Sequence, residues 1–277
     1  MNASQILITI ALVSSLTSMG CNRAANPSAP STAAPAPAPQ AAHVGSPDVA
    51  VIEAAFANPA RFAGDRDQDE PRKTKDVLVF LGAKPGMHVI DYFSASGYNS
   101  ELLSLIVGPH GQVIAYNNSP YLQFSGKQPE ERFGKNRLPN VAQLTTRPEE
   151  LPLEPNSLDA ALFVLSYHDL HWSAKDGSWP KTDPAAALSK LASALKPGAV
   201  VVVVDHVANP GGNTGATVDT LHRIDPEIIK RDFATAGLVF QSEANFLRNP
   251  ADDHTQPVFD DAIKGKTDRV VMRFVKK

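Results

Sequence analysis

The sequence predicts an α/β domain built on a doubly wound, mostly parallel sheet of seven strands with an antiparallel last strand. Three observations lead to this fold class. From residue 49 onward, strand and helix signals alternate, and repeated β-α units imply a parallel sheet. Residues 199–205 include five consecutive valines, so that strand must be covered on both faces. No helix signal separates the last two strands, so the final strand is expected to be antiparallel.

Turn and capping residues set the boundaries of the predicted elements. Helices are expected to end before Gly82, Gly108 and Pro197, because glycine and proline interrupt helical periodicity there. Asp225 is a typical N-cap, and Pro226 suits the first position of the helix that follows. The predicted helices cover residues 49–57, 72–81, 101–107, 130–136, 184–195 and 226–236. The predicted strands cover residues 87–91, 112–116, 141–145, 158–166, 199–205, 238–246 and 269–275.

Composition argues against several classes of protein. The 277 residues include 26 Lys and Arg against 29 Asp and Glu, and no basic run occurs. A general nucleic-acid-binding face needs clustered basic side chains, so nucleic acid is not an expected partner. The single cysteine excludes an intrachain disulfide and a zinc site made of several thiolates.

The N-terminal region has the pattern of an exported lipoprotein. Residues 6–16 form an apolar run that is too short to span a bilayer and typical of a signal-peptide core. Cys21 follows soon after this run, directly after Gly20, in a segment that resembles a bacterial lipobox. We expect a signal peptide at 1–20 and a lipid on Cys21 that anchors the chain at the periplasmic face of a bacterial membrane. A soluble periplasmic protein released by ordinary cleavage is the alternative.

The predicted tether follows Cys21. Residues 22–48 contain six prolines and nine alanines and almost no large apolar side chain. Such a segment buries too little surface to offset the entropy of ordering it. We therefore expect a disordered tether at 21–48 and a single domain at 49–277.

Three segments of that domain resemble motifs of one enzyme family. Residues 84–98 combine Lys-Pro-Gly, a short apolar strand that ends at Asp91, and a small-residue loop that ends at Gly97-Tyr98. Residues 157–162 and 195–200 resemble the start of the family's fourth strand and the turn before its fifth. Together they resemble the class I S-adenosylmethionine (SAM)-dependent methyltransferases. Five polar motifs, at 167–169, 205–206, 221–226, 248–253 and 266–269, resemble a group of predicted bacterial methyltransferases that are often exported.

This resemblance implies a Rossmann-like fold, SAM as the cofactor and a set of cofactor-binding residues. The implied residues are Asp91, Ser94, Ala95, Gly97, Tyr98 and Asn117. The family places glycine at the second, fourth and sixth positions after the acid, where the backbone must approach the ligand closely. This chain has Phe93, Ala95 and Gly97 at those positions. After the second strand, Asn117 occupies the place of an acid that accepts the ribose hydroxyls.

Five of the eight histidines follow the carboxyl ends of predicted strands: His168, His171, His206, His222 and His254. Carboxyl ends of parallel strands share one edge of a sheet, so these histidines are expected to line one cavity with Arg248 at its rim. We interpret His168 as the general base, oriented by Asp205 or His206, with Tyr167 near the transferred methyl group. The predicted substrate-binding residues are His171, His222, Arg223 and Arg248. No segment carries a complete set of metal ligands, so no metal is expected.

The leading interpretation is a SAM-dependent methyltransferase that acts on a small-molecule acceptor. An exported binding protein that keeps the scaffold without catalysis is the alternative, because a fold alone does not carry an activity. A nicotinamide-dependent oxidoreductase is disfavoured, since the first loop lacks two glycines needed to approach a pyrophosphate. Residues 172–183 and 207–224 are interpreted as lid loops. The mixed-charge segment 61–72 either closes over the site or forms a solvated surface.

Overall fold

The computed structural model describes residues 48–277, which belong to one compact unit. The predicted signal peptide, Cys21 and all but the last residue of the predicted tether lie outside the described residues, so these expectations stay predictions. Within residues 48–277, no helix combines the length and apolarity needed to cross a membrane.

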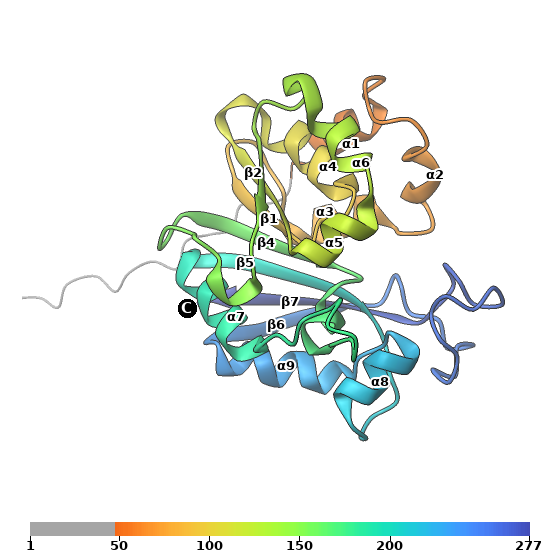
Figure 1. The fold of residues 1–277 in the computed structure, drawn as a ribbon. Helices are drawn as coiled ribbons and strands as arrows, with labels where there is room; N and C mark the ends of the chain where they lie inside the picture. Colours follow the sequence, from red (N-terminus) through yellow and green to blue (C-terminus); the bar gives the residue numbers. More distant parts are fainter. Residues whose placement is uncertain (1–47) are drawn as a thin grey trace, which may run out of the picture. The chain divides into compact units, whose positions relative to one another are not determined.

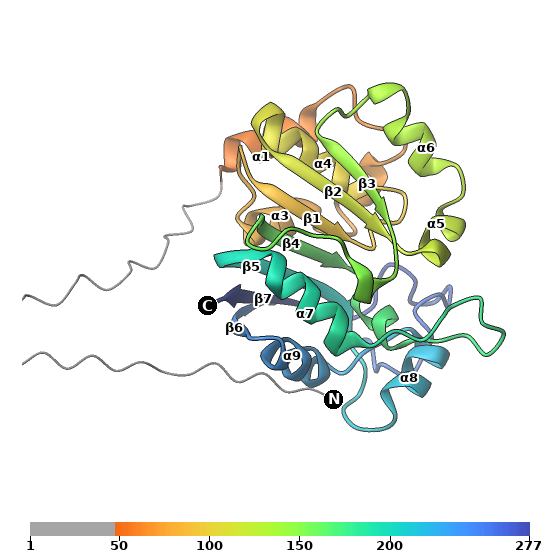
Figure 2. The same ribbon diagram turned by 60° about the vertical axis from the view of Figure 1, so that its left-hand side comes forward.

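The described residues form a seven-stranded sheet in the order β3-β2-β1-β4-β5-β7-β6, which confirms the predicted fold class (Figures 1 and 2). The strands are β1 (His88–Tyr92), β2 (Gln112–Asn117), β3 (Val141–Thr145), β4 (Leu158–Val164), β5 (Leu195–His206), β6 (Leu238–Ala244) and β7 (Arg269–Lys276). Strands β1 to β5 pair in parallel. Strand β7 lies between β5 and β6 and is antiparallel to both, as expected from the missing helix before it.

The strand order reverses at β1, which fixes where a site is expected. From β1 the chain builds β2 and β3 on one side, then returns to place β4 on the other side of β1. In doubly wound sheets, ligands bind in the crevice outside the carboxyl ends of the strands beside such a reversal. The segments that follow β1 and β4 therefore face the expected crevice.

Helices cover both faces of the sheet (Figure 2). The first face carries α1 (Val49–Ala57), α3 (Thr74–Leu81) and α4 (Tyr98–Val107), and the second carries α7 (Pro184–Ala194) and α9 (Pro226–Thr235). In β5, Val200, Val202 and Val204 pack with the first group, whereas Val201 and Val203 pack with the second. All five valines are buried, which explains why this strand shows no polar alternation.

Several short helices were not predicted from the sequence. They are α2 (Arg66–Asp69), α5 (Ser119–Ser125) and α8 (Thr214–Leu221). The last two begin with asparagine caps: Asn118 Oδ1 accepts from Tyr121 N at 2.9 Å, and Asn213 Oδ1 accepts from Ala216 N at 2.9 Å. Helix α8 lies within 207–224, so that predicted lid loop is partly helical. All three helices are too short for an apolar periodicity to stand out.

The remaining helices differ from prediction mainly at their ends. Helix α4 begins at Tyr98, three residues before the predicted start. The helix expected at 130–136 is α6 (Gln128–Phe133), followed by a 3₁₀ turn through Asn136. Three more 3₁₀ turns occur, at Gly108–His110, Pro148–Glu150 and Tyr167–His171, and the last is labelled η4.

Candidate active site

Two adjoining hollows lie at the carboxyl ends of β1, β4 and β5. The first, the aromatic hollow, has a volume of about 590 Å³. It is lined by Tyr121, Phe124, Trp172, Trp179 and Phe259 together with His168, His206 and His222. The second, the polar hollow, has a volume of about 630 Å³ and is lined by Asp65, Gln68, Ser94, Ser96, Tyr98, Asn99, Gln128 and Glu131. Arg72, Phe93, Ala95, Phe124 and Val164 line both hollows, so the two are neighbours.

A third hollow of about 670 Å³ lies at the opposite edge of the sheet, where His88 and Gln112 begin β1 and β2. Doubly wound sheets bind ligands at the carboxyl ends of their strands, not at this amino edge. The aromatic and polar hollows are therefore the candidate active site.

The loop after β1 has the backbone of a ligand-binding loop. Phe93, Ala95 and Gly97 have φ values of 57°, 49° and 84°. These are the three positions at which the family pattern has glycine, and only Gly97 adopts a left-handed conformation without strain. Each of the other two residues is strained by about 1–2 kcal/mol. Backbone strain of this kind is concentrated at functional sites in folded proteins.

Gly97 is required by packing inside the protein. A Cβ added at Gly97 would lie 2.2 Å from Phe133 Cζ and 3.0 Å from Arg132 Cδ. The Arg132 guanidinium also donates from Nε to the Ser96 carbonyl at 2.7 Å and pairs with the buried carboxylates of Asp65 and Glu101. Gly97 lines neither hollow, so its predicted cofactor contact is corrected to a structural role.

Asn117, at the end of β2, is turned toward the loop after β1. Its Oδ1 accepts from Ala95 N at 2.9 Å, and its Nδ2 donates to the Ala95 carbonyl at 3.1 Å and to Ser94 Oγ at 3.2 Å. The side chain is 5% exposed and lines neither hollow. Asn117 therefore fixes the loop, which corrects the expectation that it contacts a ribose.

Asp91, at the end of the β1 core, is also internal. It is 1% exposed, and its Oδ2 accepts from Ser100 Oγ at 2.7 Å. Burial raises the pKa of Asp91 to about 6, although the hydrogen bonds from Ser100 and the charge of Arg132 oppose this rise. Asp91 lines neither hollow, whereas Ser94, Ala95 and Tyr98 of the predicted cofactor set do.

Arg72 belongs to the candidate active site, although the sequence did not indicate a binding role for it. It lines both hollows, and its guanidinium lies 5.2 Å from the centre of the Tyr98 ring. Its Nε donates to Gln68 Oε1 at 3.2 Å, and no carboxylate within the described range 48–277 forms an ion pair with it. The charge of Arg72 is therefore available to an anionic group in either hollow. Several residues of segment 61–72 line the polar hollow, whereas closure of this segment over the site stays a prediction.

His168 reaches the aromatic hollow from the turn after β4. Leu165 has a φ of 57°, an unusual conformation for a bulky residue, and it turns the chain from β4 into η4. His168 Nδ1 donates to Asp205 Oδ1 at 2.7 Å, and its backbone N–H donates to Asp205 Oδ2 at 2.8 Å. Burial lowers the pKa of His168, but the charges of Asp169 and Asp205 outweigh burial and raise it to about 9.

His206 and His222 complete the polar part of the aromatic hollow. Nδ1 of His206 shares a hydrogen bond of 2.7 Å with Thr267 Oγ1, and burial together with nearby cations lowers the pKa of His206 to about 3. His222 follows α8 with a φ of 50°, and its ring contacts Trp172 and Phe259 at centroid distances of 5.4 and 4.9 Å. Burial also lowers the pKa of His222. Both rings are therefore neutral at pH 7.

Two histidines of the predicted cluster lie elsewhere. His171 donates from Nε2 to Asp232 Oδ2 at 2.9 Å, and His254 donates from Nε2 to Asp268 Oδ2 at 3.0 Å. Neither lines the aromatic or the polar hollow, so the expectation of five histidines in one cavity is wrong for these two. His168 and His171 both lie on η4, but the hydrogen bond to Asp232 holds the His171 ring outside the hollow, and sequence spacing does not reveal that partner.

Three other predicted site residues are structural. Tyr167 is completely buried and donates to Asp232 Oδ2 at 3.0 Å, so it is not placed beside a reacting methyl group. Arg223 is completely buried and pairs with Asp252 at 2.8 Å. Arg248 pairs with Asp268 at 2.9 Å and lines neither hollow, so the expectation that it forms the rim is also wrong.

The sequence analysis missed most of the aromatic wall. Phe93 stacks on Tyr121 and Tyr116 at centroid distances of 4.6 and 5.4 Å, and Tyr121 donates from its hydroxyl to Asp169 Oδ2. The Trp172 and Trp179 rings lie 4.8 Å apart, in the segment that was interpreted as a lid. Tyr121 lies on α5, a helix that was not predicted, which is why its role could not be recognised.

Comparisons with known proteins agree with this architecture. No family model matches the chain. The ubiquinone/menaquinone biosynthesis C-methyltransferase UbiE of Shewanella halifaxensis is 27% identical over 129 residues, which cover 47% of this chain and 46% of that protein. The homologue from Shewanella piezotolerans gives the same values. The chain thus spans about half the length of the curated relatives that it matches.

Solved structures cover more of the chain. A SAM-dependent methyltransferase from Aquifex aeolicus has a TM-score of 0.54 at 18% identity, over 83% of this chain and 99% of that one. A sarcosine dimethylglycine methyltransferase, assigned as putative, from Galdieria sulphuraria has a TM-score of 0.53 at 17% identity, over 85% and 93%. The [4+2]-cyclase SpnF has a TM-score of 0.56 at 15% identity, over 82% and 92%. The chain therefore has the fold of the class I SAM-dependent methyltransferases.

Proposed function

We propose that the chain is a SAM-dependent methyltransferase that acts on a small-molecule acceptor. The observation that carries this proposal is the position of the loop after β1, whose left-handed residues Phe93 and Ala95 line both hollows at the reversal of strand order. A donor in the polar hollow and an acceptor in the aromatic hollow would meet at the wall formed by Phe93 and Ala95. Holding two reactants side by side is the main contribution of a protein to a transfer reaction.

The polar hollow suits the amino-acid end of SAM. Arg72 offers a guanidinium without a carboxylate partner in the described chain, and Ser94, Ser96 and Asn99 offer neutral hydrogen-bonding groups. Glu131 supplies a negative charge on the same wall for an ammonium group. When bound, SAM supplies an electrophilic methyl group on a sulfonium sulfur. In the family pattern an acid after the second strand accepts the ribose hydroxyls of SAM. Here the corresponding residue, Asn117, uses its side chain for hydrogen bonds to Ala95 of the loop.

His206 offers a neutral imidazole to a polar group of the acceptor. Its ring lines the aromatic hollow, and its pKa of about 3 keeps it uncharged at pH 7 but makes it a weak base. His168 has a pKa of about 9 and is a cation at pH 7, which argues against the role of general base that the sequence suggested for it. Asp205 accepts a hydrogen bond from Nδ1 of the cationic His168 and so supports a role in holding that ring in place.

The acceptor is expected to have an apolar or aromatic body. Tyr121, Trp172 and Trp179 form much of the wall of the aromatic hollow. Phe124 and Phe259 line the same hollow and are 82% and 61% exposed, so they stand at its opening. Rings of this kind give planar and apolar ligands a large contact area, and the histidines give the polar end of the ligand its hydrogen bonds.

Binding measurements separate this function from a scaffold that has lost catalysis. The replacement of a ribose-binding acid by Asn117 and the ring of Phe93 in the loop favour the second candidate, a binding protein. Isothermal titration calorimetry of the full chain with SAM, S-adenosylhomocysteine and NAD should show binding of the first two and none of NAD. Arg72→Gln should weaken SAM binding about tenfold, since a charged hydrogen bond contributes about 1.5–3 kcal/mol.

A matched control comes from Arg147, which lies on the surface away from both hollows. Arg147→Gln should bind SAM as the unaltered chain does. An absence of SAM binding at millimolar concentration would reject the methyltransferase, and binding of an apolar ligand under the same conditions would support the second candidate. Equal losses in the Arg72 and Arg147 variants would show that the effect is not local to the polar hollow.

Export and lipid anchoring are part of the proposal. They rest on the apolar run at 6–16 and on the position of Cys21, both outside the described residues. Mass spectrometry of membrane fractions should find a mature N-terminus at Cys21 that carries acyl chains. Cys21→Ser should release the protein from the membrane. A soluble mature protein that starts at another residue would contradict the anchor.

A further inference from the structure

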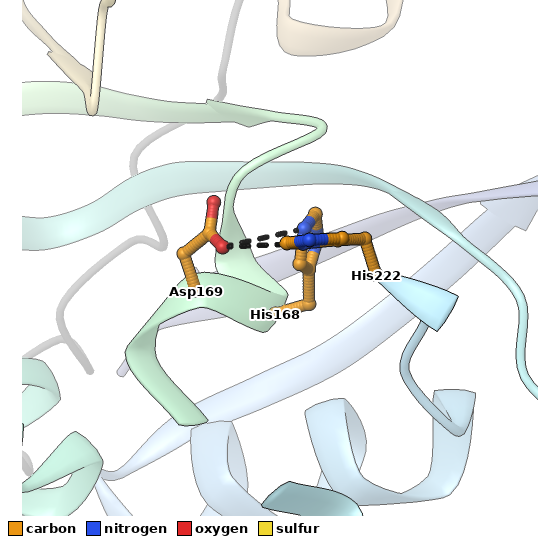
Figure 3. A group of neighbouring side chains, drawn as sticks. All are labelled: His168, Asp169 and His222. Carbon is orange, nitrogen blue, oxygen red and sulfur yellow. Dashed lines mark ion pairs between the residues drawn. The ribbon is translucent and has the colours of Figure 1, made fainter. Parts of the chain in front are cut away.

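The side chains of His168, Asp169 and His222 point toward one another (Figure 3), and all three residues line the aromatic hollow. His168 Nε2 lies 3.5 Å from Asp169 Oδ1, and His222 Nδ1 lies 4.0 Å from the same oxygen. The three atoms all lie within 4.8 Å of one another, and no other group of this kind occurs in residues 48–277. His168 and Asp169 come from η4, whereas His222 comes from the end of α8, so the fold brings two distant segments together.

The three atoms lie within ion-pair distance but do not form hydrogen bonds with one another. Both distances to Asp169 Oδ1 exceed those of ordinary N–H···O hydrogen bonds, which lie between about 2.7 and 3.2 Å. None of the three atoms forms a hydrogen bond with the described part of the chain. None of the three atoms is completely buried, and all three residues line the hollow, so the atoms face its open space.

The surrounding bonds orient these atoms for a ligand, and a bound metal ion would displace the proton that the cationic His168 carries on Nε2. Asp205 accepts from Nδ1 of His168 at 2.7 Å, which leaves Nε2 pointing toward Asp169. Tyr121 donates to Oδ2 of Asp169, which leaves Oδ1 for the histidines. A carboxylate on the distal nitrogen of a histidine and a hydrogen bond on the distal oxygen of a carboxylate are the usual supports of metal ligands.

We propose that His168 Nε2, Asp169 Oδ1 and His222 Nδ1 bind one divalent transition-metal ion. Two imidazoles and one carboxylate form the ligand set of catalytic zinc sites and of non-haem iron sites. Ligand atoms of a tetrahedral site lie about 3.3 Å apart when the metal–ligand distance is about 2.0–2.1 Å. The observed atoms lie 3.5 and 4.0 Å from Asp169 Oδ1 and within 4.8 Å of one another, so metal binding requires an inward movement, chiefly of the half-buried His222.

The remaining coordination positions of the ion would open into the aromatic hollow. An oxygen or sulfur atom of the acceptor is the expected ligand there, because catalytic sites keep one position for water or substrate. This assignment of the fourth ligand rests on the proposed function. The three protein ligands do not, since metal binding requires neither SAM nor an acceptor.

Binding of the metal alone tests the proposal. The full chain, stripped with a chelator, should bind one equivalent of Co²⁺ and develop the visible absorption bands of a low-coordinate site. Zn²⁺ should displace the Co²⁺ and abolish these bands. His222→Gln and Asp169→Asn should each weaken binding at least tenfold, as the loss of even a supporting contact does at metal sites. His110→Gln removes an exposed histidine far from the hollow and should leave binding unchanged.

The two ligand variants and the control variant give different results if the metal site is real and if it is not. If Asp169→Asn fails to fold, His222→Gln decides the question, because His222 is half-buried and its loss leaves the core intact. A chain that binds no Co²⁺ overturns the proposal. Binding that is equally strong in His222→Gln, or that is weakened in His110→Gln, also overturns it. SAM binding is measured separately without metal, so a failure of the methyltransferase function would leave this result unaffected.

Discussion

Asp91 should make the protein less stable at neutral pH than at acidic pH. Its carboxyl is 1% exposed and its pKa is raised to about 6 by burial. The folded state therefore holds this proton more tightly than the unfolded state, where the pKa is near 3.8. The stabilisation by the protonated carboxyl is complete below pH about 3.8 and is lost as the pH rises through about 6.

The magnitude follows from the two pKa values. A difference of about two units corresponds to about 3 kcal/mol of unfolding free energy. Asp91→Asn keeps an oxygen that accepts from Ser100 and carries no charge at any pH. The variant should gain up to about 3 kcal/mol over the unaltered protein between pH 4 and pH 7, equivalent to about 6–12 °C in Tm.

Urea unfolding from pH 4 to pH 8 measures this difference directly. Asp67→Asn is the control, since it makes the same change of side chain at an exposed position. A constant difference for Asp91→Asn across the same range would refute the reasoning. So would a variant that becomes relatively less stable as the pH rises, because that sign requires a lowered pKa in the folded state.

Four further substitutions test the local structure. Gly97→Ala should destabilise the protein by about 2–3 kcal/mol in urea unfolding, since it adds strain at positive φ and a contact with Phe133, and an unchanged stability would contradict this packing. Ala95→Gly should change stability by less than about 1 kcal/mol and keep or raise SAM affinity in calorimetry, because relief of strain offsets the flexibility of glycine. Arg223→Met should lower the unfolding free energy by about 3–5 kcal/mol and Arg248→Met by less than about 1 kcal/mol. Equal effects would contradict their different burial.

The sheet could be predicted because its strands are short apolar runs between strong turn signals. The five consecutive valines of β5 and the missing helix before β7 were sufficient to place a parallel core with one antiparallel strand. The short helices α5 and α8 could not be predicted, since they bury few residues and depend on the caps Asn118 and Asn213. Tertiary packing, rather than periodicity, holds such helices in place.

The candidate site was predictable in position but not in composition. The shared edge of parallel strands correctly indicated that His168, His206 and His222 lie together. Which side of a short turn a residue faces depends on partners elsewhere in the chain. His171 forms a hydrogen bond with Asp232 and so lies outside the hollow, and no local sequence pattern predicts that contact. Arg72 could not be singled out for the same reason, because only the folded chain shows that it has no acidic partner within residues 48–277.

A crystal structure of the full chain with S-adenosylhomocysteine tests the central claim most directly. If the chain is a methyltransferase, the amino-acid end of the ligand occupies the polar hollow, and its carboxylate lies within hydrogen-bonding distance of Arg72. The thioether sulfur should point toward the aromatic hollow, past Phe93 and Ala95. Ligand bound at any other surface, or hollows without ligand at saturating concentration, would contradict the assignment of this edge of the sheet as a methyltransferase active site.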